Sequence, residues 1–181
     1  YSCFYVVSWR KCVNPSTRLL SIVVPVFNER ENLATLVREI VTVMDERHFQ
    51  YELILVDDGS TDGSSAEFET LCREYPLLKV IELRRNFGQT AAMAAGFHHA
   101  RGEVVIPLDG DLQNDPADIP RLLAKLDEGY DVVSGWRRVR HDTWMTRRLP
   151  SGIANKLISL MTGVKLHDYG LSLIHISEPT R

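Results

Sequence analysis

The chain has 181 residues, of which 44% are hydrophobic and 25% charged, and its formal net charge is −3. These values fit one soluble globular domain with a substantial core, and the slightly acidic balance disfavours nucleic acid as a partner. Three widely spaced cysteines form neither a zinc pattern nor a disulfide framework, which favours a reducing compartment, and no apolar run reaches the roughly 20 residues of a membrane span.

Strands and helices alternate along the first half of the chain. Residues 1–18 have no usable periodicity and form an expected N-terminal extension. Residues 20–27 are a nearly continuous β-branched run, typical of a strand buried on both faces. A helix follows from the apolar spacing between Leu33 and Met44, and Asn28 is its expected N-cap. Next come a strand at 51–56, a loop at 57–63, a helix at 64–74 and a strand at 77–83.

The same alternation continues in the second half. An Ala-rich helix packed closely on the sheet is expected at 90–101, a strand at 104–108, and a helix from Pro116 to near Gly129. A further strand at 131–134, a basic stretch at 137–148 and a helix at 153–161 complete the pattern. This order predicts a single α/β domain over residues 19–172, with a mainly parallel sheet flanked by helices.

Polar clusters follow three of these strands: Asn28–Glu29, Asp57–Asp58, and the pair Asp109 and Asp111. Crossover connections bring the carboxyl ends of parallel strands to one rim, where ligands bind in open α/β sheets. Asp109 and Asp111 are two residues apart, so in extended chain they face the same way and could hold one cation or one diphosphate. Hard oxygen ligands of this kind suit Mg²⁺ or Mn²⁺. The alternative is an ordinary solvated Asp-Gly turn.

Other residues near the predicted strand ends complete a possible site for a sugar linked to a diphosphate. Glu29 and Asp58 would face ribose hydroxyls and base edges, and Arg137 could add a fork of donors to phosphate. Simpler explanations exist for each, since Glu29 could complement a helix dipole, Asp58 could cap a turn, and residues 137–148 could be a solvated loop. The candidate wall comprises Pro25, Phe27, Glu29, Val56 and Asp58, with Gln113 near the metal.

The motifs of three common nucleotide-binding or hydrolytic folds are missing from the sequence. There is no Gly-x-Gly-x-x-Gly after the first strand, which disfavours a dinucleotide-binding dehydrogenase. There is no Gly-Lys-Ser/Thr phosphate loop, and no serine stands in a Gly-x-Ser-x-Gly elbow.

Three blocks, at residues 23–29, 56–63 and 108–113, resemble the signatures of family 2 glycosyltransferases with the GT-A fold. Further blocks at 85–92, 133–137 and 163–170 resemble the polyprenyl-phosphate glycosyltransferases, relatives of dolichyl-phosphate mannosyltransferase. The resemblance runs from about residue 20 to residue 172.

The resemblance implies a role for each matching residue. Asp109 and Asp111 would be the Asp-x-Asp pair around Gly110, where relatives often carry alanine, and Gln113 would help on the metal. Arg137 would contact the donor diphosphate, Arg147 or Arg148 would contact phosphate, and Asp168 would lie near the acceptor. Pro25, Phe27, Glu29, Val56 and Asp58 would hold the nucleotide.

The implied activity is metal-dependent, inverting transfer of a sugar from a nucleoside diphosphate to a polyprenyl phosphate, such as undecaprenyl or dolichyl phosphate. This would take place at the cytoplasmic face of a membrane. Asp168 would orient such an acceptor or deprotonate a hydroxyl acceptor. Two alternatives stay open: a soluble family 2 enzyme with a sugar-hydroxyl acceptor, and an inactive nucleotide-sugar-binding fragment.

The two ends of the sequence suggest a fragment of a longer protein, because it lacks an initial Met and residues 173–181 resemble a translated sequencing adapter. Membrane helices that many relatives carry would then be missing. We expect residues 173–181 to be a non-native or disordered tail, although a strand could persist through Ile176. Beyond Ile176 the polar residues have no apolar period that would offset the entropy of ordering them.

Overall fold

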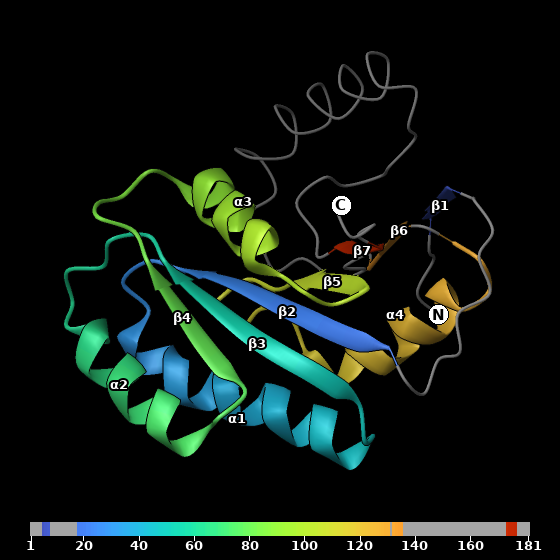
Figure 1. Cartoon of the computed structure of the whole chain (residues 1–181), viewed down its shortest axis with the longest axis horizontal. Helices are drawn as coiled ribbons and strands as arrows, with labels where there is room; N and C mark the ends of the chain where they lie inside the picture. The colour runs from blue at the N-terminus through green and yellow to red at the C-terminus, as the bar shows by residue number, and fades with distance from the viewer. Residues whose placement is uncertain (1–4, 8–17, 131, 136–172, 177–181) are drawn as a thin grey trace, which may run out of the picture.

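The computed structural model describes residues 5–7, 18–130, 132–135 and 173–176. The strands in these ranges form one sheet in the order β1-β6-β7-β5-β2-β3-β4, and helices cover both of its faces (Figure 1). In chain order the elements are β1 (Tyr5–Val7), β2 (Leu19–Val26), α1 (Arg30–Glu46), β3 (Gln50–Asp57), α2 (Ser64–Glu74), β4 (Leu78–Glu82), α3 (Gln89–His99), β5 (Val104–Pro107), η1 (Pro116–Asp118), α4 (Ile119–Leu126), β6 (Val132–Ser134) and β7 (Leu173–Ile176).

The centre of the sheet is parallel. β2 lies between β3 and β5, with Ile22 opposite both Leu53 and Ile106, and β4 extends the parallel set beside β3. Helices connect these strands by crossovers, so the predicted α/β architecture is confirmed. The carboxyl ends of all four parallel strands meet at one rim, which places the loops after β2, β3 and β5 next to one another.

Each face of the sheet has its own core. On one face, alternate residues of β2 pack with α1, α2 and α4 in the larger core, while Val23 faces the other side with Ile54 and Val56 beneath α3 (Figure 1). Gly96 allows the close approach of α3, because a Cβ there would fall 2.2 Å from the Cγ1 atom of Val23. The expectation of an Ala-rich helix packed tightly on the sheet is therefore confirmed.

The other edge of the sheet is antiparallel, which the sequence did not predict. β6 pairs with β1 and with β7, and β7 also pairs with β5. Thus residues 5–7 of the expected extension and residues 173–176 of the expected tail are strands, while residues 177–181 and the helix expected at 153–161 lie outside the described residues. Strands of three or four residues carry too little periodicity to reveal their direction.

A buried polar network ties the sheet together at the end opposite the rim. Glu52 is 6% exposed, and its carboxylate accepts hydrogen bonds from the Ser21 hydroxyl at 2.6 Å, the Lys79 ammonium at 2.5 Å and the Arg101 backbone N–H at 2.6 Å. The Ser21 oxygen in turn accepts the Gly102 N–H at 2.8 Å. One charged side chain therefore links β2, β3, β4 and the α3–β5 loop.

The Glu52 network makes stability depend on pH. Burial raises the pKa of Glu52, but the hydrogen bonds from Lys79, Ser21 and Arg101 outweigh burial and lower the pKa below its ordinary 4.5. The resulting stabilisation is present above the unfolded pKa and is lost as the pH falls through the lowered folded pKa. We expect Glu52→Gln to destabilise the fold by about 1 to 3 kcal/mol near neutral pH and to flatten the acid limb of the stability curve. Urea midpoints measured from about pH 7 to about pH 3 test this, and equal acid limbs in the two proteins would contradict it.

Candidate functional site

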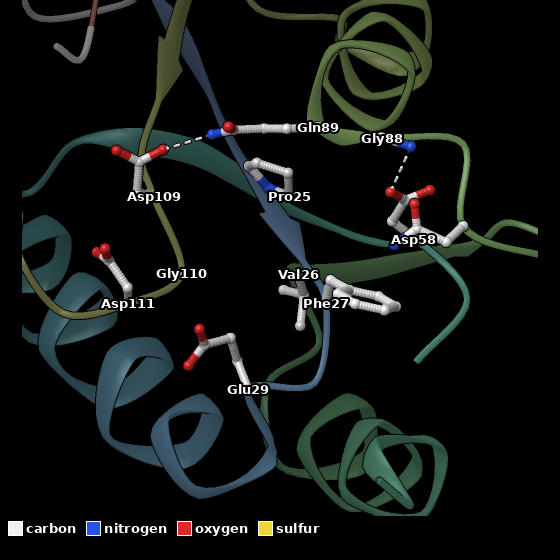
Figure 2. Close-up of a pocket in the computed structure, with 11 residues that line it drawn as sticks. Pro25, Val26, Phe27, Glu29, Asp58, Gly88, Gln89, Asp109, Gly110 and Asp111 are labelled. Carbon is white, nitrogen blue, oxygen red and sulfur yellow. Dashed lines mark hydrogen bonds between the residues drawn. The ribbon is translucent and has the colours of Figure 1, made fainter. Parts of the chain in front are cut away.

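One cavity of about 410 Å³ lies at the rim where the parallel strands end. Figure 2 shows Phe27 and Asp58 at one end of it and Asp109 and Asp111 at the other, with Pro25 between them. The three polar clusters that follow β2, β3 and β5 in the sequence are thus gathered around one space. The lining residues are Pro25, Val26, Phe27, Glu29, Asp58, Asn86, Gly88, Gln89, Asp109, Gly110 and Asp111.

The β2–α1 loop contributes Phe27 and Glu29 to the cavity, and Phe27 is 44% exposed. A neighbouring turn of α1 holds the Glu29 carboxylate, because the Asn32 side-chain amide donates to Oε2 at 2.6 Å. The ring therefore offers an open apolar face for a planar group, while the carboxylate offers acceptors for hydroxyls.

The prediction that Asn28 caps α1 is wrong. Glu29 occupies the N-cap position without a side-chain hydrogen bond, and the cap comes from another loop: the Arg30 N–H donates to Asp62 Oδ2 at 3.0 Å. Asp62 Oδ1 also accepts from the Ser64 hydroxyl at 2.5 Å and the Ser64 N–H at 3.1 Å. Chiefly through that hydroxyl, these bonds lower the pKa of Asp62. One carboxylate thus serves the starts of both α1 and α2, which a local sequence pattern cannot show.

Asp58 joins the end of β3 to the loop between β4 and α3. It is 3% exposed, and its two carboxylate oxygens accept the backbone N–H groups of Phe87 at 2.7 Å and Gly88 at 2.8 Å. Figure 2 shows the bond from Gly88. The interpretation of Asp58 as a turn-capping residue and its placement in the cavity are therefore compatible. Each oxygen keeps acceptor capacity for a ligand while the carboxylate fixes this wall.

Asp58→Asn is expected to destabilise the fold by about 1 to 3 kcal/mol, because an amide cannot accept on both sides and leaves one of the two partly buried backbone N–H groups without its partner. Asp115→Asn is the matched control. Asp115 caps η1 through a single oxygen, which accepts the Ala117 N–H at 2.9 Å, and an asparagine side-chain oxygen can accept the same bond. Thermal unfolding of both variants measures the difference. Equal melting temperatures would show that Asp58 does not hold the β4–α3 loop.

Asp109 and Asp111 line the same cavity but have different surroundings. Asp109 is half-buried, and its oxygens accept from the Gln89 side-chain amide at 2.9 Å and the Asn114 side-chain amide at 3.2 Å. Asp111 is exposed, and one of its oxygens accepts the Gln113 N–H at 3.0 Å. Asp109 is thus oriented by neighbouring amides, while Asp111 presents its charge to solvent at the cavity wall.

This pair supplies two carboxylates for a hard cation rather than a complete protein cage. Among the residues that the structure describes, no group of three or more His, Cys, Asp or Glu side chains could enclose a metal ion. A site of this kind suits Mg²⁺ or Mn²⁺, which keep waters and take phosphate oxygens as further ligands.

Two other predicted site residues do not line the cavity. Val56 is fully buried under α3 and supports the cavity from within the sheet, and Gln113 is exposed beside Asp111 but does not line the cavity. Arg137, Arg148 and Asp168 lie outside the described residues.

The sequence did not single out four of the lining residues: Val26, Asn86, Gly88 and Gln89. The last three follow β4, the remaining parallel strand. The rim argument that located the other clusters could have found them. These residues were missed because their loop carries no carboxylate, whereas the other clusters were recognised by their carboxylates.

A second cavity of about 550 Å³ adjoins the first and shares Phe27 and Asn86 with it. Arg84 and Arg85 line it from the β4–α3 loop, and the Arg85 guanidinium lies 4.8 Å from the centre of the Phe87 ring. Opposite them are residues of the β3–α2 loop, including Ser60 and Thr61. The hollow at the rim thus extends past Phe27 into a region lined by side chains of both charges, since Asp57 and Glu82 also line it.

The geometry agrees with a match to a known family. The model of the glycosyl transferase family 2 domain matches residues 21–175, most of the chain. The chain belongs to glycosyl transferase family 2. A curated relative, dodecaprenyl-phosphate galacturonate synthase of Rhizobium johnstonii, is 49% identical over 156 residues, which are 85% of this chain and 46% of the relative. The chain therefore spans about half the length of that relative.

Solved structures confirm the fold of this family 2 chain. S. aureus TarS 1–349 in complex with UDP-GlcNAc is 27% identical with a TM-score of 0.52, over 62% of this chain and 32% of TarS. M. tuberculosis glucosyl-3-phosphoglycerate synthase in complex with Mn²⁺, UDP and phosphoglyceric acid is 19% identical with a TM-score of 0.62, over 88% of this chain and 56% of the synthase. The predicted GT-A architecture is confirmed.

Proposed function

We propose that this chain is the donor-binding part of an inverting glycosyltransferase that moves a sugar from a nucleoside diphosphate to a polyprenyl phosphate. The observation that carries the proposal is the cavity of about 410 Å³ at the rim, which has an apolar ring at one end and two carboxylates at the other. A nucleotide sugar has the same polarity, with a flat base, a ribose with hydroxyl groups and a charged diphosphate.

The nucleoside would occupy the end formed by Phe27, Glu29 and Asp58. Phe27 offers a ring face for the base, and the carboxylates of Glu29 and Asp58 accept hydrogen bonds from ribose hydroxyls and base edges. Pro25 and Gly110 would shape the floor, and Val56 would act from beneath by supporting β3. TarS, which shares this fold at 27% identity, binds UDP-GlcNAc.

The diphosphate would lie at the other end, beside Asp109 and Asp111. Because two carboxylates and a diphosphate would otherwise repel each other, a divalent cation is needed between them, with Asp111 as a direct ligand and Asp109 and Gln113 beside it. Mg²⁺ and Mn²⁺ both suit these oxygen ligands, and the M. tuberculosis structure of the same fold holds Mn²⁺ with UDP. When bound, the cation would stabilise negative charge on the leaving diphosphate.

The acceptor is proposed from chemistry and from the relative's name. The R. johnstonii relative is named for a product on dodecaprenyl phosphate. A phosphate monoester has a second pKa of about 6, so it is largely ionised at neutral pH and needs no strong base. Asp168 would then orient the acceptor, and Arg137 and Arg148 would contact phosphate groups.

A polyprenyl acceptor would place the reaction at a membrane surface, and we propose its cytoplasmic face, where nucleotide sugars are made. In the described ranges, none of the helices has both the length and the apolar character needed to cross a membrane.

A transfer assay with UDP-linked and GDP-linked sugars and a short polyprenyl phosphate tests this function. We expect a radiolabelled lipid-linked sugar to form with Mn²⁺ or Mg²⁺ and to disappear when EDTA is added. The parallel reaction supplies a sugar hydroxyl acceptor in place of the lipid phosphate. Transfer to the hydroxyl acceptor without transfer to the lipid phosphate would contradict the proposed acceptor.

A further inference from the structure

We propose that Asn28 is a positioning residue, which latches the β2–α1 loop to the β3–α2 loop and thereby fixes both nucleotide-binding walls of the cavity. This inference rests on the proposed function. Asn28 itself does not line the cavity, whereas its two neighbours, Phe27 and Glu29, both do.

The latch consists of two hydrogen bonds in opposite directions between the loops. The Asn28 backbone N–H donates to the Ser60 hydroxyl oxygen at 2.9 Å, and the Asn28 side-chain oxygen accepts the Thr61 backbone N–H at 2.8 Å. The nearby bond from the Arg30 N–H to Asp62 adds a third link between the same loops. These partners are 32 or 33 positions apart in the chain, so the bonds fix tertiary rather than local structure.

The backbone of Asn28 explains why this residue type is suited to the position. Its φ is +56°, in the left-handed region that is costly for most side chains but is tolerated by glycine, asparagine and aspartate. The turn at this residue lets the flanking Phe27 and Glu29 face the same cavity. Glycine could make the turn but lacks the side-chain acceptor, and alanine provides neither.

The latch also reaches the second wall. The Ser60 hydroxyl that accepts from Asn28 donates to the Asp57 carboxylate, which also accepts the Ser60 N–H at 3.0 Å. Asp57 precedes Asp58, whose carboxylate holds the β4–α3 loop. Hydrogen bonds from Asn28 through Ser60 to Asp57, continued by the peptide bond to Asp58, therefore connect the β2–α1 loop with the carboxylate that holds the β4–α3 loop.

The first test measures the latch without any ligand. Hydrogen exchange of the Thr61 amide, followed by NMR, should be slow in the unchanged chain and in Asn28→Asp, which keeps the acceptor and tolerates the left-handed turn. It should be faster by about tenfold or more in Asn28→Gly and Asn28→Ala, because a broken tertiary hydrogen bond exposes this amide through local opening. Equal Thr61 exchange in all four proteins would overturn the latch even if the chain binds nucleotides as proposed.

The second test measures affinity for UDP and GDP with Mn²⁺ by calorimetry, at a temperature where every variant is folded. The Kd should be unchanged within about twofold in Asn28→Asp and raised about tenfold in Asn28→Ala, since binding must then reorder two loosened side chains, and Asn28→Gly should fall between them. The control is Thr70→Ala, which loses one exposed helix hydrogen bond on α2.

The outcomes of the second test separate the possible failures. If Asn28→Ala lowers the melting temperature but binds like the unchanged chain, Asn28 is merely structural and the positioning role is overturned. If the unchanged chain binds neither nucleotide, the proposed function fails, and this inference fails with it. Weak binding by Asn28→Ala together with full affinity in Asn28→Asp supports the positioning role.

Discussion

Asp111→Asn is expected to abolish the cation-dependent part of nucleoside diphosphate binding and to leave the fold intact. The exposed Asp111 carboxylate would be a direct ligand of the cation that neutralises the diphosphate. An amide oxygen carries no net charge, so both cation affinity and the attraction of the diphosphate fall. We expect the Kd for UDP or GDP with Mn²⁺ to rise at least about 100-fold, since a bound cation supplies several kcal/mol of charge stabilisation.

The fold should tolerate this change, because an asparagine oxygen can still accept the Gln113 N–H that Asp111 accepts at 3.0 Å. Asp118→Asn is the matched control: Asp118 is an exposed carboxylate outside the cavity that pairs only with Arg121 at the surface, among the contacts that the structure describes. Surface ion pairs of this kind contribute little to the stability of the fold. Calorimetry with and without Mn²⁺ gives the comparison. Unchanged cation-dependent affinity in Asp111→Asn would remove Asp111 from the metal site.

Gly59→Ala is expected to destabilise the fold more than Glu52→Gln or Asp58→Asn. Gly59 has a φ of +73°, and a Cβ there would fall 2.5 Å from the backbone carbonyl carbon of Arg85 and 2.8 Å from the backbone nitrogen of Asn86. Neither obstacle can rotate away, because both are backbone. Strain of the left-handed alanine and separation of the two loops together should cost about 2 to 5 kcal/mol, which corresponds to a melting temperature lower by about 5 to 15 °C.

Gly129→Ala distinguishes the two causes. Gly129 also has a left-handed φ, +100°, but a Cβ there meets nothing within 4 Å, so its substitution measures backbone strain without the steric clash. Gly59→Ala should melt several degrees below Gly129→Ala and should also bind UDP more weakly, because the displaced β4–α3 loop carries Asn86 and Gly88 of the cavity. If the two variants melt together, the close approach at Gly59 does not matter for stability.

The fold centre and much of the site could be predicted from the sequence, because both depend on repeated patterns. Continuous apolar runs identify strands buried on two faces, and parallel strands must place their carboxyl ends at one rim. The prediction that Asp58 and Asp109 share a cleft is confirmed, since both line one cavity. Arg137, predicted to join them, lies outside the described residues.

The features that the sequence did not reveal depend on contacts between distant segments. Asn28 precedes a helix and is a residue type that often caps helices, yet its hydrogen-bond partners are in the β3–α2 loop. Two adjacent aspartates, Asp57 and Asp58, look alike in the sequence, but Asp57 organises its own turn while Asp58 holds the β4–α3 loop. The antiparallel pairing of β6 has no local signal either, because strand direction is decided by the partner.

Paramagnetic NMR tests the central claim most directly, because Mn²⁺ broadens the amide signals nearest to it. Adding Mn²⁺ and UDP to the labelled chain should first broaden the amide signals of residues 110–113. In a parallel sample with Mg²⁺ and UDP, the amide signals of Phe27, Asp58 and Gly88 should shift from their positions in the nucleotide-free chain without broadening. This outcome would place cation and nucleotide at the two ends of one cavity. Broadening centred on other carboxylates, such as Glu67 and Glu69 on α2, with no nucleotide-dependent shift at Phe27 or Asp58, would contradict the account.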